Sequence, residues 1–248
     1  MIIIKSHDEI KRMAEACRIV AEVLDGIREN IAPGVATIEL DGFAETFICK
    51  RGARPAFKGY RGYPASVCTS INEQVVHGIP SSIKLGEGDI VSLDIGVYYK
   101  GFYGDAAVTL PVGKINERAG RLLFTTEKAL QSGIEKAVPG RRLSDVSAAI
   151  QCCAEAEGFS VVRSFVGHGI GRELHEEPQI PNFGKDGKGP ELREGMTLAI
   201  EPMVNAGGWE VEILEDGWTA VTKDGSLSAH FEHTIAITKD GNIVLTKL

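Results

Sequence analysis

Two aspartates lie inside a strongly apolar stretch, and this constrains the fold more than any other sequence feature. Residues 89–110 read DIVSLDIGVYYKGFYGDAAVTL, in which two strand-like segments flank a KG pair typical of a tight turn. A two-residue turn there places Asp105 opposite Gly96, so Asp94 and Asp105 become diagonal neighbours on one face of a β-hairpin.

Two carboxylates on one apolar face repel each other and cost several kcal/mol to remove from water. A positive group should therefore lie between them, and a metal ion or a pair of metal ions is the natural candidate. The alternative is a hairpin whose polar face meets solvent, with both acids simply exposed. The hairpin alone leaves both interpretations open.

Composition and charge narrow the class of protein. With 248 residues, of which 43% are hydrophobic and 25% charged, the chain can bury a large core as a soluble globular protein. A net charge of −7 without a basic run argues against a direct nucleic-acid function. The opening MIIIK is too short for a signal peptide or a membrane span, so we expect no membrane association.

The cysteines indicate a reducing compartment. There are five, an odd number, and they lack CxxC spacing: Cys17, Cys49, Cys68, Cys152 and Cys153. Free thiols in the cytoplasm fit this pattern better than disulfides or a cysteine zinc site.

Helical patterns occur twice in a similar order. A Ser-x-x-Glu capping box at Ser6 begins the first helix, and further helices are expected from Thr37 to Gly52, over residues 116–137, and from a Ser144 cap to Gly158. Pro-Gly pairs at 33–34 and 139–140 are 106 positions apart, as are Gly52 and Gly158. We interpret this as an internal duplication of residues 1–110 and 111–248 within one domain; chance recurrence of helix-stop signals is the alternative.

The expected fold class is α+β. After each pair of helices come strands and glycine-rich loops, which predicts a curved antiparallel sheet backed by helices with pseudo-twofold symmetry.

Three more metal-ligand types lie in apolar, strand-like surroundings: His168 in VGHGIG, Glu201 in LAIEPMV and Glu232 in HFEHT. With Asp94 and Asp105 they make four carboxylates and one imidazole, a set that two divalent cations would balance and that suits Mn, Fe, Co or Zn. Two metals sharing carboxylates form a hydrolytic centre that activates water. A purely structural ion is the alternative.

The other histidines divide into two groups. His77 in VVHGIP and His175 in GRELHEEP either position a substrate or stabilise an oxyanion, or simply hydrogen-bond their loops. His7 should be exposed, and His233 should point to the face opposite Glu232. His230 shares the face of Glu232, but we do not assign it to the site.

In this order the motifs SLDIG, GFYGDAA, GHGIG, AIEP and FEHT, with GYPASVCTSINEQVVHGIP and GHGIGRELHEEPQIPNFG, resemble the methionine aminopeptidases over nearly the whole chain. The resemblance implies the pita-bread fold, which agrees with the duplication. It points to the short bacterial type I form, because no cysteine-rich N-terminal extension and no long insertion between Glu201 and Glu232 are present.

The resemblance also implies roles. Asp94 would bind one metal, His168 and Glu201 the other, and Asp105 and Glu232 would bridge the two. A metal-bound hydroxide would attack the first peptide bond, and Glu201 would carry a proton from the water to the leaving amine.

Substrate contacts follow in the same way. His175 would hydrogen-bond the scissile carbonyl, and His77 would contact the substrate near the scissile nitrogen. Four residues match positions that line the methionine pocket, although ordinary core packing would also explain them: Tyr60, Tyr63, Cys68 and Trp218.

The chain departs from the best-known bacterial members at Phe57, where they have Cys, and at Leu174, where they have Phe. Both changes are apolar for apolar and concern pocket shape. Substrates should be nascent chains with a small residue after the initiator methionine, met by a monomeric enzyme in transient contact with the ribosome.

Two other functions compete. A proline-directed peptidase of the prolidase or aminopeptidase P type uses the same fold but carries a large N-terminal domain. A non-catalytic pita-bread protein would bind RNA or protein, but such relatives have lost metal ligands and gained basic tails.

Overall fold

The computed structural model describes residues 1–247, and its first helix begins where the sequence predicts. Helix α1 spans His7–Arg28. The Ser6 hydroxyl accepts a hydrogen bond from the Glu9 amide (3.3 Å), and the Glu9 carboxylate accepts one from the Ser6 amide (2.8 Å). These two bonds complete the capping box and satisfy amides that the helix itself leaves unpaired.

The hairpin around the two aspartates has the predicted register. Strand β4 (Ile90–Tyr99) pairs antiparallel with β5 (Phe102–Pro111), and Gly96 lies opposite Asp105. Lys100 and Gly101 between them both have positive φ, 48° and 91°. This is the backbone of a type I′ turn, whose twist matches that of the paired strands.

Three further helices and a short 3₁₀ turn complete the helical part: α2 (Thr37–Lys50), α3 (Glu117–Lys136), α4 (Leu143–Ala156) and η1 (Tyr60–Gly62). The predicted Ser144 cap of α4 is wrong. The cap is Arg142, whose amide donates to the Asp145 carboxylate (3.0 Å), while the Ser144 hydroxyl instead pairs with the backbone of Lys188.

The strands form four antiparallel sheets. Strand β4 lies between β1 and β2 and also pairs with β5; the other sheets run β15-β14-β9-β7-β8, β13-β10-β6 and β11-β12-β3. The remaining strands are β1 (Arg54–Pro55), β2 (Cys68–Ile71), β3 (Gln74–Val76), β6 (Ser160–Val161), β7 (Val166–Gly169), β8 (Glu176–Pro181), β9 (Thr197–Ile200), β10 (Met203–Asn205), β11 (Val211–Ile213), β12 (Ala220–Thr222), β13 (Ser228–His230), β14 (His233–Thr238) and β15 (Gly241–Val244).

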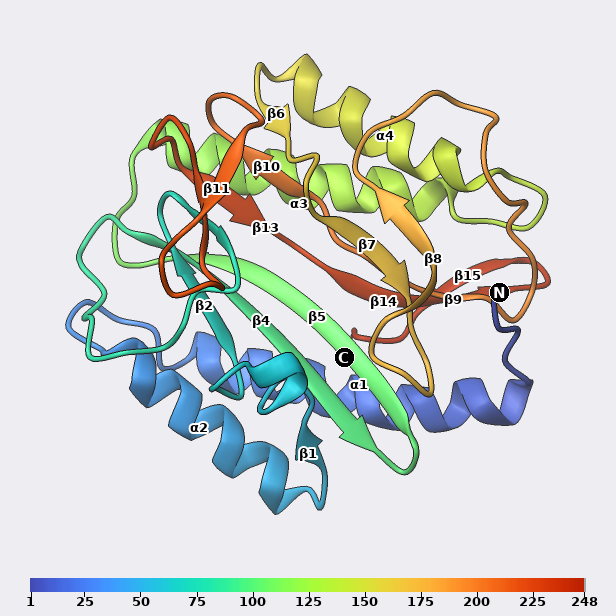
Figure 1. Ribbon diagram of the computed structural model, residues 1–248, viewed down its shortest axis with the longest axis horizontal. Coiled ribbons are helices and arrows are strands. Elements are labelled where there is room, and N and C mark those ends of the chain that lie inside the picture. Colours follow the sequence, from blue (N-terminus) through green and yellow to red (C-terminus); the bar gives the residue numbers. More distant parts are fainter. Residues whose placement is uncertain (248) are drawn as a thin grey trace.

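The helices lie in two pairs on opposite sides of the strands, with α1 and α2 near the β4–β5 hairpin and α3 and α4 near β6 and β10 (Figure 1). This arrangement of helices and antiparallel sheets is the predicted α+β class. The internal duplication and the single domain stay predictions. Among residues 1–247, no helix is both long and apolar enough to cross a lipid bilayer.

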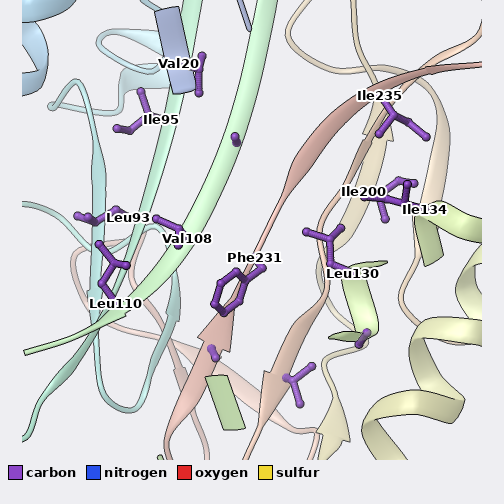
Figure 2. Packing of buried hydrophobic residues seen from close by; sticks show 14 of the residues in the cluster. Val20, Leu93, Ile95, Val108, Leu110, Leu130, Ile134, Ile200, Phe231 and Ile235 are labelled. Atoms are coloured by element: carbon purple, nitrogen blue, oxygen red, sulfur yellow. The ribbon is translucent and has the colours of Figure 1, made fainter. Parts of the chain in front are cut away.

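One large core joins both helix pairs to the strands. Figure 2 shows the ring of Phe231 between Val108 of β5 and Leu130 of α3, where the two halves of the core meet. The labelled members of this core are Val20, Leu93, Ile95, Val108, Leu110, Leu130, Ile134, Ile200, Phe231 and Ile235. Burial of these side chains stabilises the sheet by roughly 1.5–3 kcal/mol each, which can offset the cost of polar groups elsewhere on the sheet.

Helix α1 lies directly against β5 beside Asp105. A Cβ atom added at Gly104 would lie 2.7 Å from the Cys17 amide nitrogen and 2.9 Å from its Cα. Because backbone atoms meet backbone here, any side chain would push the helix away from the strand that carries Asp105.

We expect Gly104→Ala to lower the free energy of unfolding by about 1–3 kcal/mol, as overpacking typically does. Gly120→Ala is the matched control, because only Ile115 Cδ1 approaches that Cβ, at 4.0 Å. Gly120 lies inside α3, so its replacement should stabilise the protein by about 0.5–1 kcal/mol. Urea unfolding measures both, and equal stabilities of the two variants would contradict the contact described here.

Candidate active site

The structure brings every predicted site residue into one cavity of about 150 Å³. These residues are far apart in the sequence, on four strands, one 3₁₀ turn and several loops. The lining includes all of them together with Phe57, Arg61 and Leu174: Tyr60, Tyr63, Cys68, His77, Asp94, Asp105, His168, His175, Glu201, Trp218 and Glu232. One end of this cavity is rich in acids and histidines, and the other is apolar.

Hydrogen bonds between β5 and the start of β14 hold the acidic end of the cavity. The Asp105 amide donates to the Thr234 hydroxyl (3.2 Å), which in turn donates to the Asp105 carbonyl oxygen (2.8 Å). The Glu232 amide donates to the Ala107 carbonyl oxygen (2.9 Å). These bonds connect β5 to the start of β14, so Asp105 and Glu232 meet although 127 residues separate them (232 − 105).

The ligand atoms of Asp105, His168 and Glu232 all lie within 4.8 Å of one another. His168 Nε2 is 3.5 Å from Glu201 Oε1 and 3.9 Å from Asp105 Oδ2. Its Nδ1 is 2.9 Å from the Gly169 carbonyl oxygen, an acceptor only, so Nδ1 carries the proton. Nε2 faces the carboxylates and is the ring nitrogen available to a metal ion.

These acids are buried, and the surrounding protein supplies too few hydrogen bonds and positive charges to compensate for the lost water. Asp105 is 3% exposed and Glu232 is 2% exposed. Burial raises the pKa of Asp94 and of Glu201 to about 7. Burial, reinforced by the neighbouring carboxylates, raises the pKa values of Asp105 and Glu232 well above the usual range.

Three buried oxygens of these four acids have no hydrogen-bond partner: Asp94 Oδ1, Asp105 Oδ1 and Glu232 Oε1. Buried carboxylate oxygens normally accept hydrogen bonds or coordinate cations. Four carboxylates and one imidazole at this spacing are hard, mostly oxygen donors. The residues therefore fit divalent metal ions.

His230 belongs to this group, although we did not assign it from the sequence. It is buried, and its Nε2 lies 3.6 Å from Glu201 Oε2 without a hydrogen-bond partner. Burial lowers the pKa of this ring. The available signal was its position two residues before Glu232, which puts both on one face of an extended segment.

His233 turns away, as predicted, because its Nδ1 lies 2.9 Å from the Thr246 hydroxyl.

The two loop histidines approach the carboxylates from outside the strand ladders. His175 Nδ1 lies 2.8 Å from the Tyr60 hydroxyl, and its ring is stacked on Tyr60 at 5.3 Å. His77 meets Phe165 edge-on at 5.4 Å, and burial lowers its pKa to about 4. Burial likewise lowers the pKa of His175 to about 3, so both rings are neutral near pH 7.

A second cavity of about 190 Å³ shares four of these residues with the first: His77, Asp94, His175 and Glu201. Its other lining residues include Phe165 and Met203. The shared acids and histidines thus lie between the second cavity and the apolar end of the first cavity.

The apolar end is a slot lined mainly by buried side chains. Phe57, Tyr63, Cys68 and Leu174 are buried there, and Trp218 meets the Tyr63 ring edge-on at 5.2 Å. Burial raises the pKa of the Cys68 thiol far above its usual range, so this cysteine is an apolar wall rather than a nucleophile. A flexible apolar side chain would fill this slot with its backbone at the acids.

The fold and site define a metal-dependent peptidase. The profile of metallopeptidase family M24 matches residues 11–239, so the chain belongs to that family.

Several relatives that match nearly the whole chain are methionine aminopeptidases. That of Clostridium perfringens is 55% identical over 246 residues and 99% of both chains, and methionine aminopeptidase 1 of Bacillus subtilis is 54% identical over 100% of both. The crystal structure of methionine aminopeptidase from Thermotoga maritima superposes with a TM-score of 0.98 at 52% identity over 100% of both chains.

The prolidase of Pyrococcus furiosus is less similar, with a TM-score of 0.79 and 26% identity over 99% of this chain and 66% of that one. These neighbours confirm the pita-bread fold and favour the methionine aminopeptidases over the proline-directed alternative.

Proton release on metal binding should depend on pH. Since burial raises the pKa of Asp94 and of Glu201 to about 7, both hold protons at about pH 6 and few at about pH 8. A bound cation must displace them, so Mn²⁺ affinity should fall about tenfold per pH unit for each displaced proton as pH decreases through about 7.

Calorimetric titration with Mn²⁺ in buffers of different ionisation enthalpy counts the released protons. Asp94→Asn is the control and should release fewer protons at about pH 6 than the unmodified protein. Equal proton release at both pH values would contradict the raised pKa values.

Proposed function

We propose that this protein is a metal-dependent aminopeptidase that removes the N-terminal methionine from proteins and peptides whose second residue is small. The observation that carries the proposal is the apolar slot that ends at a cluster of buried carboxylates. The slot suits an unbranched thioether side chain, and the cluster suits cations that act on the bond next to it.

The proposed ligand set divides between two ions. Asp94 would hold one ion and His168 with Glu201 the other, while Asp105 and Glu232 would be shared. Bound divalent cations, whether Co, Mn, Fe or Zn, lower the pKa of water and polarise the scissile carbonyl. The central position of Asp105, within reach of His168 and opposite the small Gly96, supports its shared role.

Glu201 is the proposed proton carrier. Its two oxygens face His168 Nε2 (3.5 Å) and His230 Nε2 (3.6 Å), and the Asn182 amide holds its backbone carbonyl (3.1 Å). The carboxylate is thus fixed beside the cluster and still reaches the cavity. It would accept the proton of the attacking water and return it to the leaving amine.

The loop histidines would bind the substrate backbone. If Tyr60 donates its hydroxyl hydrogen to Nδ1 of neutral His175, the ring proton is on Nε2. His175 Nε2 would then donate to the scissile carbonyl oxygen and stabilise the negative charge that develops there. His77 would contact the substrate near the scissile nitrogen, and Tyr60, Tyr63, Cys68 and Trp218 would enclose the methionine side chain.

The cellular setting belongs to the same proposal. Nascent chains would be the substrates, met by a monomeric, cytoplasmic enzyme in transient contact with the ribosome and without a direct nucleic-acid function. The five cysteines are free thiols, which suits a reducing compartment.

Incubating the metal-loaded protein with Met-Ala-Ser and with Leu-Pro tests the reaction. We expect release of free methionine from the first peptide and no cleavage of the second, because the slot accepts methionine next to the cluster. Chromatography of free amino acids measures both. Cleavage of Leu-Pro alone would establish the proline-directed alternative, and cleavage of neither would favour a binding protein.

Asp105→Asn should lower kcat/KM for Met-Ala-Ser by at least about 10³-fold and reduce bound metal, because a shared ligand loses its charge. Asp186→Asn is the matched control: it removes an equal charge from an exposed loop and should leave both unchanged. Peptide assays with elemental analysis measure the effect. An active Asp105→Asn variant with full metal content would refute the shared-ligand role.

A further inference from the structure

A buried ion pair connects the N-terminal segment to the turn that carries His175. Lys5 Nζ pairs with Glu176 Oε2, and both side chains are 2% exposed. The Lys5 amide also donates to the Gly195 carbonyl oxygen (2.8 Å), which fixes the segment itself. Apolar side chains of similar size often stabilise a core as well as a buried ion pair does, so a role other than stability should be sought.

The Glu176 carboxylate organises the turn. Its other oxygen, Oε1, accepts hydrogen bonds from the amides of Arg172 (2.8 Å) and Glu173 (3.3 Å). A Cβ added at Gly171 would collide with the Lys5 side chain and with Glu176 Oε1. The lysine stem therefore lies against the backbone of the turn. The Glu176 carboxylate binds the amides at the start of the turn with one oxygen and Lys5 with the other.

A second connection to the same turn is exposed. Arg172 pairs with Glu9 Oε1 (2.8 Å) with 58% of its side chain exposed, and its guanidinium lies over the Phe102 ring at 4.9 Å. Exposed pairs of this kind contribute about 0–1 kcal/mol. The turn therefore has one buried and one exposed tie to the first residues of the chain.

His175 depends on this turn for its position. It follows Leu174 and precedes Glu176, and its ring contacts the Tyr60 hydroxyl and ring and the tilted ring of His168, whose centroid is 4.3 Å away. No strand ladder fixes its backbone, since β8 begins at Glu176. The placement of the turn therefore decides whether His175 Nδ1 meets Tyr60.

We propose that Lys5 and Glu176 form a positioning pair for His175, so that the N-terminal segment takes part in the reaction without touching the substrate. This inference rests on the proposed function, in which His175 donates to the scissile carbonyl. Loss of Lys5 leaves the Glu176 carboxylate buried without its cation, and the turn should shift to expose it. A displacement of about 1 Å at a positioned group can cost about 10²-fold in rate.

The experiment compares Lys5→Met with Arg172→Met, each in the unmodified protein and in a His175→Ala background. Metal-loaded proteins are assayed with Met-Ala-Ser. Lys5→Met should lower kcat by about 10- to 100-fold in the unmodified protein and by less than about twofold in the His175→Ala background. Arg172→Met, the matched control on the same turn, should change kcat by less than about twofold in both.

Two additions separate positioning from unfolding. The double variant Lys5→Met with Glu176→Gln has no unpaired buried charge, so it should fold. It also lacks the ion pair that links the turn to Lys5, so it should still show the loss that depends on His175. Long-range ¹H–¹⁵N spectra of the His175 ring should change in both Lys5 variants and not in Arg172→Met, while Mn²⁺ affinity stays constant in all of them.

Equal losses for Lys5→Met in both backgrounds, or no loss in either, would overturn the positioning role while leaving the proposed function intact. An unmodified protein that releases no methionine would overturn the proposed function and, with it, the role of the pair.

Discussion

The structure depends on keeping buried carboxylates of like charge close together. Asp105 and Glu232 are almost completely enclosed, and Asp94 and Glu201 complete the cluster. Such a set resists folding unless protons or cations neutralise it. The backbone supplies the opposing constraint, since the bonds between Asp105 and Thr234 and between Glu232 and Ala107 fix the carboxylates in place. The backbone keeps these carboxylates together even when they are deprotonated and repel each other. The site is therefore preorganised to bind cations.

The period-two alternation of β4 and β5 makes this arrangement possible. Leu93 and Ile95 belong to the core shared with the helices, whereas Asp94 between them lines the cavity. Gly104 lets α1 lie directly on β5, and the next residue is Asp105. The packing that stabilises the sheet therefore also holds the proposed metal ligands. The core face of the hairpin cannot move without moving the face that lines the cavity.

Local rules predict the elements, and tertiary contacts decide the rest. The capping box at Ser6 and the KG turn gave the start of α1 and the register of the hairpin, because both are closed by neighbouring residues. Ser144 failed as a cap because Asp145 satisfies the Arg142 amide without a side-chain hydrogen bond from the cap residue. Residue type in apolar, strand-like surroundings grouped the five metal-ligand candidates, and the family resemblance added their roles and the pocket residues. His230 was missed because its approach to Glu201 depends on strands that are distant in sequence, and the Lys5–Glu176 pair joins residues 171 positions apart.

The site residues differ in how their backbones are held, and this explains why a buried pair lies beside His175. Asp94 and His168 lie in strands that are paired on both sides. Asp105 lies in β5, which pairs with β4 on one side and is held by Thr234 on the other. His175 lies just before β8, on a turn that ladders do not reach. A group that stabilises developing charge must be held as accurately as a metal ligand, since its benefit falls steeply with displacement. Lys5 of the N-terminal segment and Glu176, next to His175, supply that accuracy. Their ion pair is buried in a low-dielectric environment, so solvent does not loosen its geometry.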